Sequence, residues 1–182
     1  IETWTLLKNY WRFGLNSFIK QPAYNDEDIF RDDNAWVYET EKFWYNGFWI
    51  KSDRRKKLIL SIDAGIGNAK LRGKGYYSQF EIDYKPIDPL NLSLEFKRDI
   101  SPNYMQYVDI IEDNSEIVRV YAKSKQTTDQ IQLRLDWTFS PNLTFQGYFQ
   151  PFFADIKYDN FSNLLAPETM NLGSYDYLSN HD

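Results

Sequence analysis

The sequence predicts an all-β fold, part of an antiparallel up-and-down transmembrane β-barrel, and three observations lead to this prediction. Several segments alternate apolar and polar residues, which is the two-residue period of a strand with one apolar face. Turn residues separate these segments. Aromatic residues make up 18% of the chain while the mean hydropathy is only -0.62, as expected where lipid-facing and interior side chains alternate.

The segment 130–150 shows this alternation most clearly. Its apolar residues take every second position from Ile131 to Phe139, and polar residues take the positions between them. Residues 140–142 interrupt the pattern, which resumes at Leu143. Each arm is about ten residues long, close to the roughly 9 to 11 residues that a tilted strand needs to cross the hydrocarbon layer. The segment therefore predicts a transmembrane hairpin.

About seven strands are expected in all. They comprise residues 4–19, 36–52, 58–67, 76–84, 90–96, 131–139 and 143–150. Bacterial single-chain barrels have even strand numbers, so at least one further strand is expected outside this stretch. The chain has no initial Met or signal peptide and opens in an expected strand. We therefore expect residues 1–182 to form a single domain that is a fragment of a larger barrel.

The connections between the expected strands also favour a bacterial barrel, in which tight periplasmic turns alternate with long external loops. Short turns are expected at residues 53–57, 85–89 and 140–142, and long external loops at about 21–42, 99–129 and 152–182, with a further connection at 68–75. Within 99–129, β-branched and aromatic residues predict that both halves continue the flanking strands beyond the membrane, up to a turn around residues 112–116.

The alternation also assigns the strand residues to two faces. The residues expected to face lipid are Leu58, Leu60, Ile62, Leu90, Leu92, Leu94, Ile131, Leu133, Leu135 and Trp137. The polar residues expected to face the lumen are Arg12, Asp63, Glu81, Glu95, Arg134 and Asp136. Such charges could select the solute that passes through the barrel. Alternatively, they pair across strands and only hold the barrel together.

The composition disfavours several functional classes. A net charge of -5 argues against a nucleic-acid partner, which usually requires a basic surface. The chain has no Cys for disulfides or thiolate metal sites and no apolar run long enough for a membrane helix. Its only histidine, His181, lies next to the end, and there is neither a nucleophile elbow nor a P-loop. We therefore expect no enzyme activity, catalytic residue, cofactor or metal.

Two charged clusters and a group of loop aromatics are candidate contact sites. The acidic external loop contributes Asp26, Asp28, Asp32 and Asp33. These carboxylates could hold calcium, although their spacing differs from that of a calcium-binding loop. The basic turn at residues 54–57, with Lys51, could contact lipid phosphates or an acidic periplasmic partner, or be merely solvated. The aromatics of the external segments, among them Tyr24, Tyr38 and Tyr104, could stack on sugars, or they pack within the loops or contact a partner.

Several short motifs resemble a large bacterial family. They lie at residues 52–56, 107–108, 120–123, 126–128, 133–143 and 148–152, and the likeness covers most of residues 43–161. Members of that family join an N-terminal module similar to carbohydrate-binding family nine to a C-terminal domain of unknown function, which is predicted to be an outer-membrane β-barrel. The resemblance implies the barrel domain alone and carries over no catalytic residue. The acidic residues 26–33 stand where that family has a segment rich in glycine and arginine.

Three hypotheses for the function follow from these observations. The first is a bacterial outer-membrane barrel that acts as a conduit or as the membrane anchor of a carbohydrate-binding module. The second is a structural subunit of a larger outer-membrane complex, in which the aromatics of residues 43–51, whose face the alternation leaves ambiguous, form the protein contact. The third is a soluble carbohydrate-binding β-sandwich, whose apolar faces would be buried against each other. The expected partners are outer-membrane lipids, other outer-membrane or periplasmic proteins and glycans, with no nucleic acid.

Overall fold

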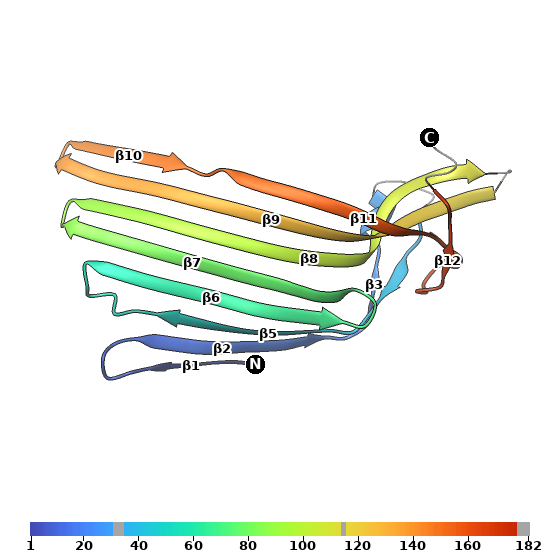
Figure 1. Cartoon of the computed structure of the whole chain (residues 1–182), viewed down its shortest axis with the longest axis horizontal. Coiled ribbons are helices and arrows are strands. Elements are labelled where there is room, and N and C mark those ends of the chain that lie inside the picture. Colours follow the sequence, from blue (N-terminus) through green and yellow to red (C-terminus); the bar gives the residue numbers. More distant parts are fainter. Residues whose placement is uncertain (31–34, 114–115, 178–182) are drawn as a thin grey trace.

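The computed structural model describes residues 1–30, 35–113 and 116–177, and antiparallel β-strands dominate it (Figure 1). The main sheet contains β1 (Glu2–Leu6), β2 (Arg12–Lys20), β5 (Phe43–Lys51), β6 (Leu58–Ala69), β7 (Gly73–Ile87), β8 (Leu90–Asp113), β9 (Glu116–Ser140), β10 (Leu143–Phe149), β11 (Phe152–Leu164) and β12 (Leu172–Ser174). A second sheet pairs β3 (Ala23–Asn25) with β4 (Tyr38–Thr40). A 3-10 turn, η1 (Glu27–Phe30), lies between β3 and β4. No helix in the described residues is long and apolar enough to cross a membrane.

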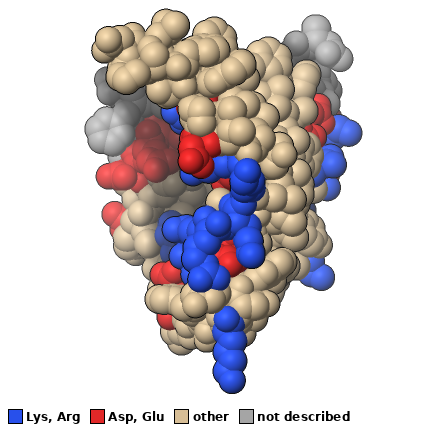
Figure 2. Space-filling model, turned by 90° about the vertical axis from the view of Figure 1, so that its left-hand side faces the viewer, with Lys and Arg blue, Asp and Glu red and all other residues tan. Residues whose placement is uncertain are grey.

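The main sheet has ten strands in up-and-down order and forms a single layer. Its order is β1-β2-β5-β6-β7-β8-β9-β11-β12, with β10 also paired to β9. The described strands do not pair β1 with the far edge, so the sheet stays open and is not a closed barrel by itself. Viewed along the strands from the turn end, the sheet borders a hollow that contains charged side chains (Figure 2). The expected all-β antiparallel fold is therefore confirmed.

The prediction of a single strand at residues 4–19 is wrong, because this segment forms the β1–β2 hairpin. Leu7 and Tyr10 close the turn through backbone hydrogen bonds, Leu7 N to Trp11 O at 2.8 Å and Tyr10 N to Leu7 O at 2.9 Å. Tyr10 adopts a φ of 65°, in the left-handed region. Asn9 supports the turn because its side-chain oxygen accepts a hydrogen bond from Trp11 N at 3.2 Å.

The prediction of a long loop at residues 152–182 is also wrong for its first part, which forms β11 and pairs with β9. Both β10 and β11 lie along the same edge of β9, and Pro151 separates them because proline has no N–H for the ladder. Pro151 still accepts a hydrogen bond from Ile131 N at 3.1 Å. Beyond the break, Ala154, Ile156 and Tyr158 face the polar side of β9, so the apolar alternation is inverted there.

The segment 99–129 is not a loop but the outer part of the β8–β9 hairpin, as the composition of its two halves predicted. The connection expected at 68–75 is shorter than predicted, since only residues 70–72 separate β6 from β7. Gly73 makes this tight turn possible with a φ of 85°. The expected loop at 21–42 contains β3, η1 and β4, whereas the strand expected from residue 36 begins only at Phe43.

The hydrophobic core lies at one end of the sheet, opposite the tight turns. We call it the end cluster, which consists of Tyr38, Tyr104, Met105, Tyr121 and Leu164, with Trp36, Tyr107, Met170 and Leu172 packed around them. These residues come from β4, the outer halves of β8 and β9, β11 and the segment that leads into β12. The end cluster thus ties the end of the long hairpin to the connection between β2 and β5.

Candidate functional site

One face of the main sheet is apolar and exposed from β2 to β10. Strand register places all ten residues expected to face lipid on this face, since directly paired residues point to the same side. None of the ten is buried, and Leu58, Leu94 and Leu133 are 48%, 38% and 45% exposed. Register adds Phe13, Leu15, Phe48 and Ile50 from β2 and β5. Among the described residues, no second layer covers this apolar face.

Aromatic side chains border the apolar face along the strand direction. Tyr76 and Tyr84 lie on the same face of β7, are 47% and 44% exposed, and bracket Phe80 and Ile82. At about 3.4 Å per residue, the stretch from Tyr76 to Tyr84 is about 27 Å long, or about 20 Å along the axis of a barrel with strands tilted near 40°. Outer-membrane barrels have an apolar band about 25 Å tall between aromatic girdles.

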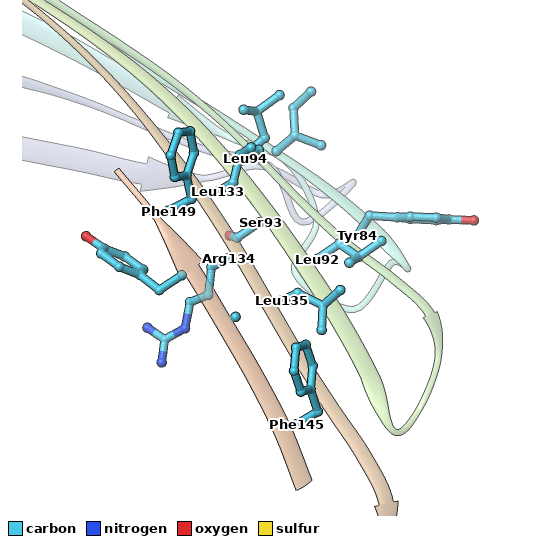
Figure 3. A pocket seen from close by; sticks show the side chains of 12 residues that line it. Tyr84, Leu92, Ser93, Leu94, Leu133, Arg134, Leu135, Phe145 and Phe149 are labelled. Carbon is cyan, nitrogen blue, oxygen red and sulfur yellow. The ribbon is translucent and has the colours of Figure 1, made fainter. Parts of the chain in front are cut away.

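The apolar face contains a groove of about 550 Å³ over β7, β8, β9 and β10 (Figure 3). Phe145 and Phe149 rise from β10 on the side of Leu133 and Leu135, whereas Arg134 extends to the other side of the sheet. Gly147 lies between the two phenylalanines and contributes no side chain. Apart from Ser93, Arg134 and the hydroxyls of two tyrosines, the residues that line the groove are apolar.

The opposite face, which we call the polar face, carries all six residues expected to face the lumen. Arg12 and Asp63 line one hollow of about 390 Å³, together with Lys51 and Arg54. Glu81 and Glu95 are direct cross-strand partners, and Gln79 Nε2 donates a hydrogen bond to Glu95 at 2.9 Å. On β9, Arg134 Nε donates to Asp136 at 3.1 Å, and Gln146 Nε2 donates to the same carboxylate at 3.1 Å.

The polar face therefore combines paired charges with charges left to the solvent. Arg134 and Asp136 remain 53% and 28% exposed, so water screens their attraction. Three positively charged side chains, Arg12, Lys51 and Arg54, and two negatively charged ones, Glu2 and Asp63, line the hollow. Both interpretations of the interior charges, solute selection and cross-strand pairing, are compatible with this arrangement.

Aromatic rings lie across glycines on the polar face. The ring of Tyr45 covers the positions where Gly47 and Gly65 would carry a Cβ atom, and Trp49 does the same for Gly14. Residues 43–51 contain five aromatics, on both faces of the sheet. The three on the polar face, Phe43, Tyr45 and Trp49, pack over glycine backbone within the chain. An added side chain would meet an aromatic ring at Gly14 and Gly65, and Asn16 Oδ1 at Gly47, so a larger residue at these positions would require those side chains to move.

We expect Gly65→Ala to destabilise the sheet by about 1 to 3 kcal/mol, because the new methyl group would displace the Tyr45 ring from its packed position. Gly147→Ala is the matched control, since the nearest atom to its added methyl is 3.6 Å away and little change is expected. Denaturant unfolding in detergent measures both. If Tyr45→Ala does not reduce the cost of Gly65→Ala in the double variant, the ring is not responsible.

The basic turn between β5 and β6 is partly neutralised within the chain. Asp53 accepts hydrogen bonds from Arg55 N at 3.0 Å, Arg55 Nε at 2.9 Å and Arg55 Nη2 at 2.8 Å. The Arg55 guanidinium also lies 3.1 Å above the ring of Tyr10. Lys57 Nζ donates to Pro86 O at 2.7 Å. These contacts hold the turn in one conformation. It lies at the end of the sheet that carries the tight turns, which faces the viewer in Figure 2.

Hydrogen bonds from Arg55 lower the pKa of Asp53 to about 2. Because this folded-state pKa is below the ordinary value of about 3.9, the carboxylate stabilises the turn above about pH 4, and the contribution is lost as the pH falls through 2. Carboxyl chemical shifts measured by NMR should show this midpoint. Arg55→Gln should return it toward the ordinary value, whereas Arg54→Gln should leave it near 2. An unchanged midpoint in the first variant would contradict the assignment.

Comparison with protein-family models matches residues 1–182 to a domain of unknown function, DUF5916. The chain belongs to this family. No curated protein and no solved structure matches it. The expected relationship to a domain of unknown function is thus confirmed, and the DUF5916 match covers the whole chain rather than residues 43–161 alone. The carbohydrate-binding module and the barrel assignment stay proposals.

The end cluster of the DUF5916 chain was missed by the sequence reasoning. Tyr121 is 1% exposed and contacts Tyr38 and Tyr107 edge-on, with ring centroids 5.6 and 6.0 Å apart. Burial, and then the Asp28 carboxylate, raise the pKa of Tyr38 and Tyr121 well above the ordinary value for tyrosine. The only available signal was the excess of aromatic and β-branched residues among the charges of residues 104–125. Tyr38 and Tyr104 are buried in the end cluster, so these two aromatics pack within the chain and are not exposed for stacking on sugars.

The acidic loop of the DUF5916 chain is only partly described. Asp32 and Asp33 lie outside the described residues, and Asp26 is exposed. Asp28 is 6% exposed and lines a polar hollow of about 300 Å³ with Lys20, Arg72 and Tyr104. In the described part of the chain, no three His, Cys, Asp or Glu residues are placed to share a metal ion. The structure therefore brings Asp28 to the end cluster, where its carboxylate lies near Tyr38 and Tyr121.

Glu41 connects the end cluster to the β6–β7 turn. Its carboxylate is buried and accepts hydrogen bonds from Leu71 N at 2.8 Å and Arg72 N at 2.7 Å. Its own backbone N donates to the Tyr104 hydroxyl at 3.2 Å, and that hydroxyl donates to Glu39 O at 3.2 Å. A charged acceptor for two backbone N–H groups is a strong local restraint.

We expect Glu41→Ala to destabilise this end of the sheet by about 3 kcal/mol, because two backbone N–H groups lose a charged acceptor. Glu39→Ala is the matched control, since the hydrogen bonds of Glu39 to Tyr104 and Thr169 use its backbone atoms, which the substitution keeps. Hydrogen exchange at the Leu71 and Arg72 amides should become faster in the first variant only. Unchanged exchange at both amides would show that Glu41 does not hold the turn.

Proposed function

We propose that this DUF5916 domain forms part of the wall of a bacterial outer-membrane β-barrel. In this proposal the barrel serves as a conduit or as the membrane anchor of a carbohydrate-binding module. The observation that carries the proposal is the apolar face, which is continuous over neighbouring strands, exposed and uncovered in the described residues, while the opposite face of the same strands is polar.

A membrane accounts for this arrangement better than water does. Monomeric soluble proteins rarely expose contiguous apolar patches larger than a few hundred Å², and each apolar Å² left in water costs about 25 cal/mol. Acyl chains can cover such a face without a second protein layer. The strands β6, β7, β8 and β9 are also long enough to cross the hydrocarbon layer, with 12, 15, 24 and 25 residues.

The soluble sandwich has less support. It would require a second sheet about 10 Å above the apolar face, whereas the other described sheet, β3–β4, contributes Tyr38 to the end cluster. The role as a structural subunit depended on the aromatics of residues 43–51, and three of these five have partners within the chain, such as Tyr45 over Gly65. These observations favour a barrel wall over both alternatives.

Closing the barrel requires partners for both edges of the sheet. The edges at β1 and at β10–β11 leave backbone N–H and C=O groups that cannot stay unpaired in hydrocarbon. In our proposal, further strands pair with these edges. The number of those strands sets the lumen width and so decides between a conduit and a filled anchor.

The proposal is tested with the protein that contains this domain, expressed with its export signal. We expect it to fractionate with outer membranes, to need detergent for extraction and to migrate differently on a gel before and after heating. A soluble, detergent-independent protein would overturn the proposal. Ion conductance in a planar bilayer would then distinguish a conduit from an anchor.

A further inference from the structure

A row of lysines crosses the apolar side of the sheet beyond the apolar band. Lys125 on β9 and Lys157 on β11 are direct cross-strand partners. Pro102 on β8 pairs with Lys125 across the other edge of β9, and Lys74 on β7 lines the same hollow as Pro102 and Lys125. All three lysines are exposed. Like charges placed directly opposite each other destabilise a sheet, so the Lys125–Lys157 pair needs a reason other than stability.

The row borders a hollow of about 520 Å³. Lys74, Lys123, Lys125, Lys157 and Arg72 bring five cations to its lining, against the single carboxylate of Asp159. Pro102 lies between Lys74 and Lys125, and its short side chain leaves room there. Within the described residues, none of the four lysines forms an ion pair. Asp159 is the direct cross-strand partner of Lys123, so the lining keeps an excess of four positive charges and attracts anions.

The position of this hollow along the strands matches the headgroup level of a membrane. From Trp137 to Lys125 the strand runs for about 40 Å at roughly 3.4 Å per residue, which is about 30 Å along the axis of a barrel with a tilt of about 40°. The hydrocarbon core is about 30 Å thick. The apolar residues of β9 end at Ile131, and the ion pair of Asp129 with Arg98 follows on the same side, about 21 Å from Trp137 along that axis. With Trp137 at one boundary of the hydrocarbon, the other boundary falls near this ion pair, and Lys125 and Lys157 lie about 10 Å further out.

We propose that Lys74, Lys125 and Lys157 bind the phosphate of a lipid headgroup in the leaflet at the hairpin end of the sheet. The inference rests on the proposed function, because it needs the apolar face to be immersed in lipid. A phosphate between Lys125 and Lys157 turns their repulsion into two charge-assisted hydrogen bonds. Below the lysines on the same side come Ile100, then the ion pair of Arg98 with Asp129 (3.4 Å), and then Phe96 at the edge of the apolar band, against which the lipid tails lie.

The test uses the protein folded in neutral detergent, with bound lipids counted by native mass spectrometry. Phosphatidic acid should bind, whereas diacylglycerol with the same acyl chains should not. Each basic residue near a membrane surface contributes about a fivefold change in affinity, so Lys125→Gln with Lys157→Gln should weaken phosphatidic acid binding about 25-fold. The matched control pair is Lys56→Gln with Lys85→Gln, which removes two exposed lysines near the opposite end and should leave binding unchanged.

A stability measurement gives a second readout. In neutral detergent without phosphatidic acid, the Lys125→Gln and Lys157→Gln variant should unfold at a higher denaturant concentration than the parent, since the like-charge pair is gone. The proposal is overturned if diacylglycerol binds equally well, if the double variant binds phosphatidic acid as the parent does, or if inorganic phosphate displaces the lipid at equal concentration. These outcomes are separate from failure of the barrel assignment, which would appear as a protein that folds without detergent.

Discussion

Leu133→Arg should destabilise the folded protein in lipid vesicles by about 2 to 4 kcal/mol. Leu133 lies near the middle of the apolar face, opposite Leu94 and Phe149, and is 45% exposed. An arginine near the bilayer midplane costs this much in an outer-membrane barrel because its charge must leave water. On a face bathed in water, the same substitution would stay within about 0.5 kcal/mol.

Two control variants make this experiment decisive. Gln132→Arg changes the neighbouring residue on the same strand, but on the polar face, so we expect little change. Trp137→Arg lies on the apolar face but near the turn end, where the cost should fall to about 0 to 1 kcal/mol for the charge itself. Denaturant unfolding from vesicles measures all three. Equal effects of Leu133→Arg and Gln132→Arg would remove the support for a lipid-facing side.

Tyr121→Ala should destabilise the end cluster by about 3 to 5 kcal/mol. The side chain is 1% exposed and packs between Tyr38 and Tyr107, so its loss leaves a cavity in a small core. Because that core lies beyond the apolar band, the effect should be local. Hydrogen exchange should become faster in the outer part of the β8–β9 hairpin and stay slow around Leu133.

Tyr24→Ala serves as the matched control for this second prediction, since Tyr24 is 66% exposed and removal of its ring should change stability by no more than about 0.5 kcal/mol. Unfolding is again followed by denaturant titration in detergent. Equal destabilisation by the two variants, or protection lost uniformly along β9, would show that the end cluster is not a separate core.

Local sequence pattern was sufficient to predict the two faces of the sheet. The ten apolar and six polar residues assigned by alternation each fall on a single face, because the side-chain period of a strand is two whatever its partners are. The turns near residues 53–57, 85–89 and 140–142 were also predictable, since proline, asparagine and charged residues interrupt the alternation there.

The same rule failed where the alternation did not separate apolar from polar residues. In β11 the residues Ala154, Ile156 and Tyr158 face the polar side, so the sequence pattern predicted a loop where the structure has a strand. The β1–β2 hairpin was missed because its turn depends on a left-handed Tyr10, a conformation that the residue type does not indicate.

By itself, the sequence determined that this chain is an antiparallel sheet with one apolar and one polar side, because strand alternation and turn residues act over a few neighbouring positions. Only the tertiary structure decided which distant residues meet. Tyr104 reaches Glu41 across 63 positions, and Lys125 stands beside Lys157 through strand register. Such contacts follow from how strands pair in space, which depends on the whole sheet rather than on any local pattern.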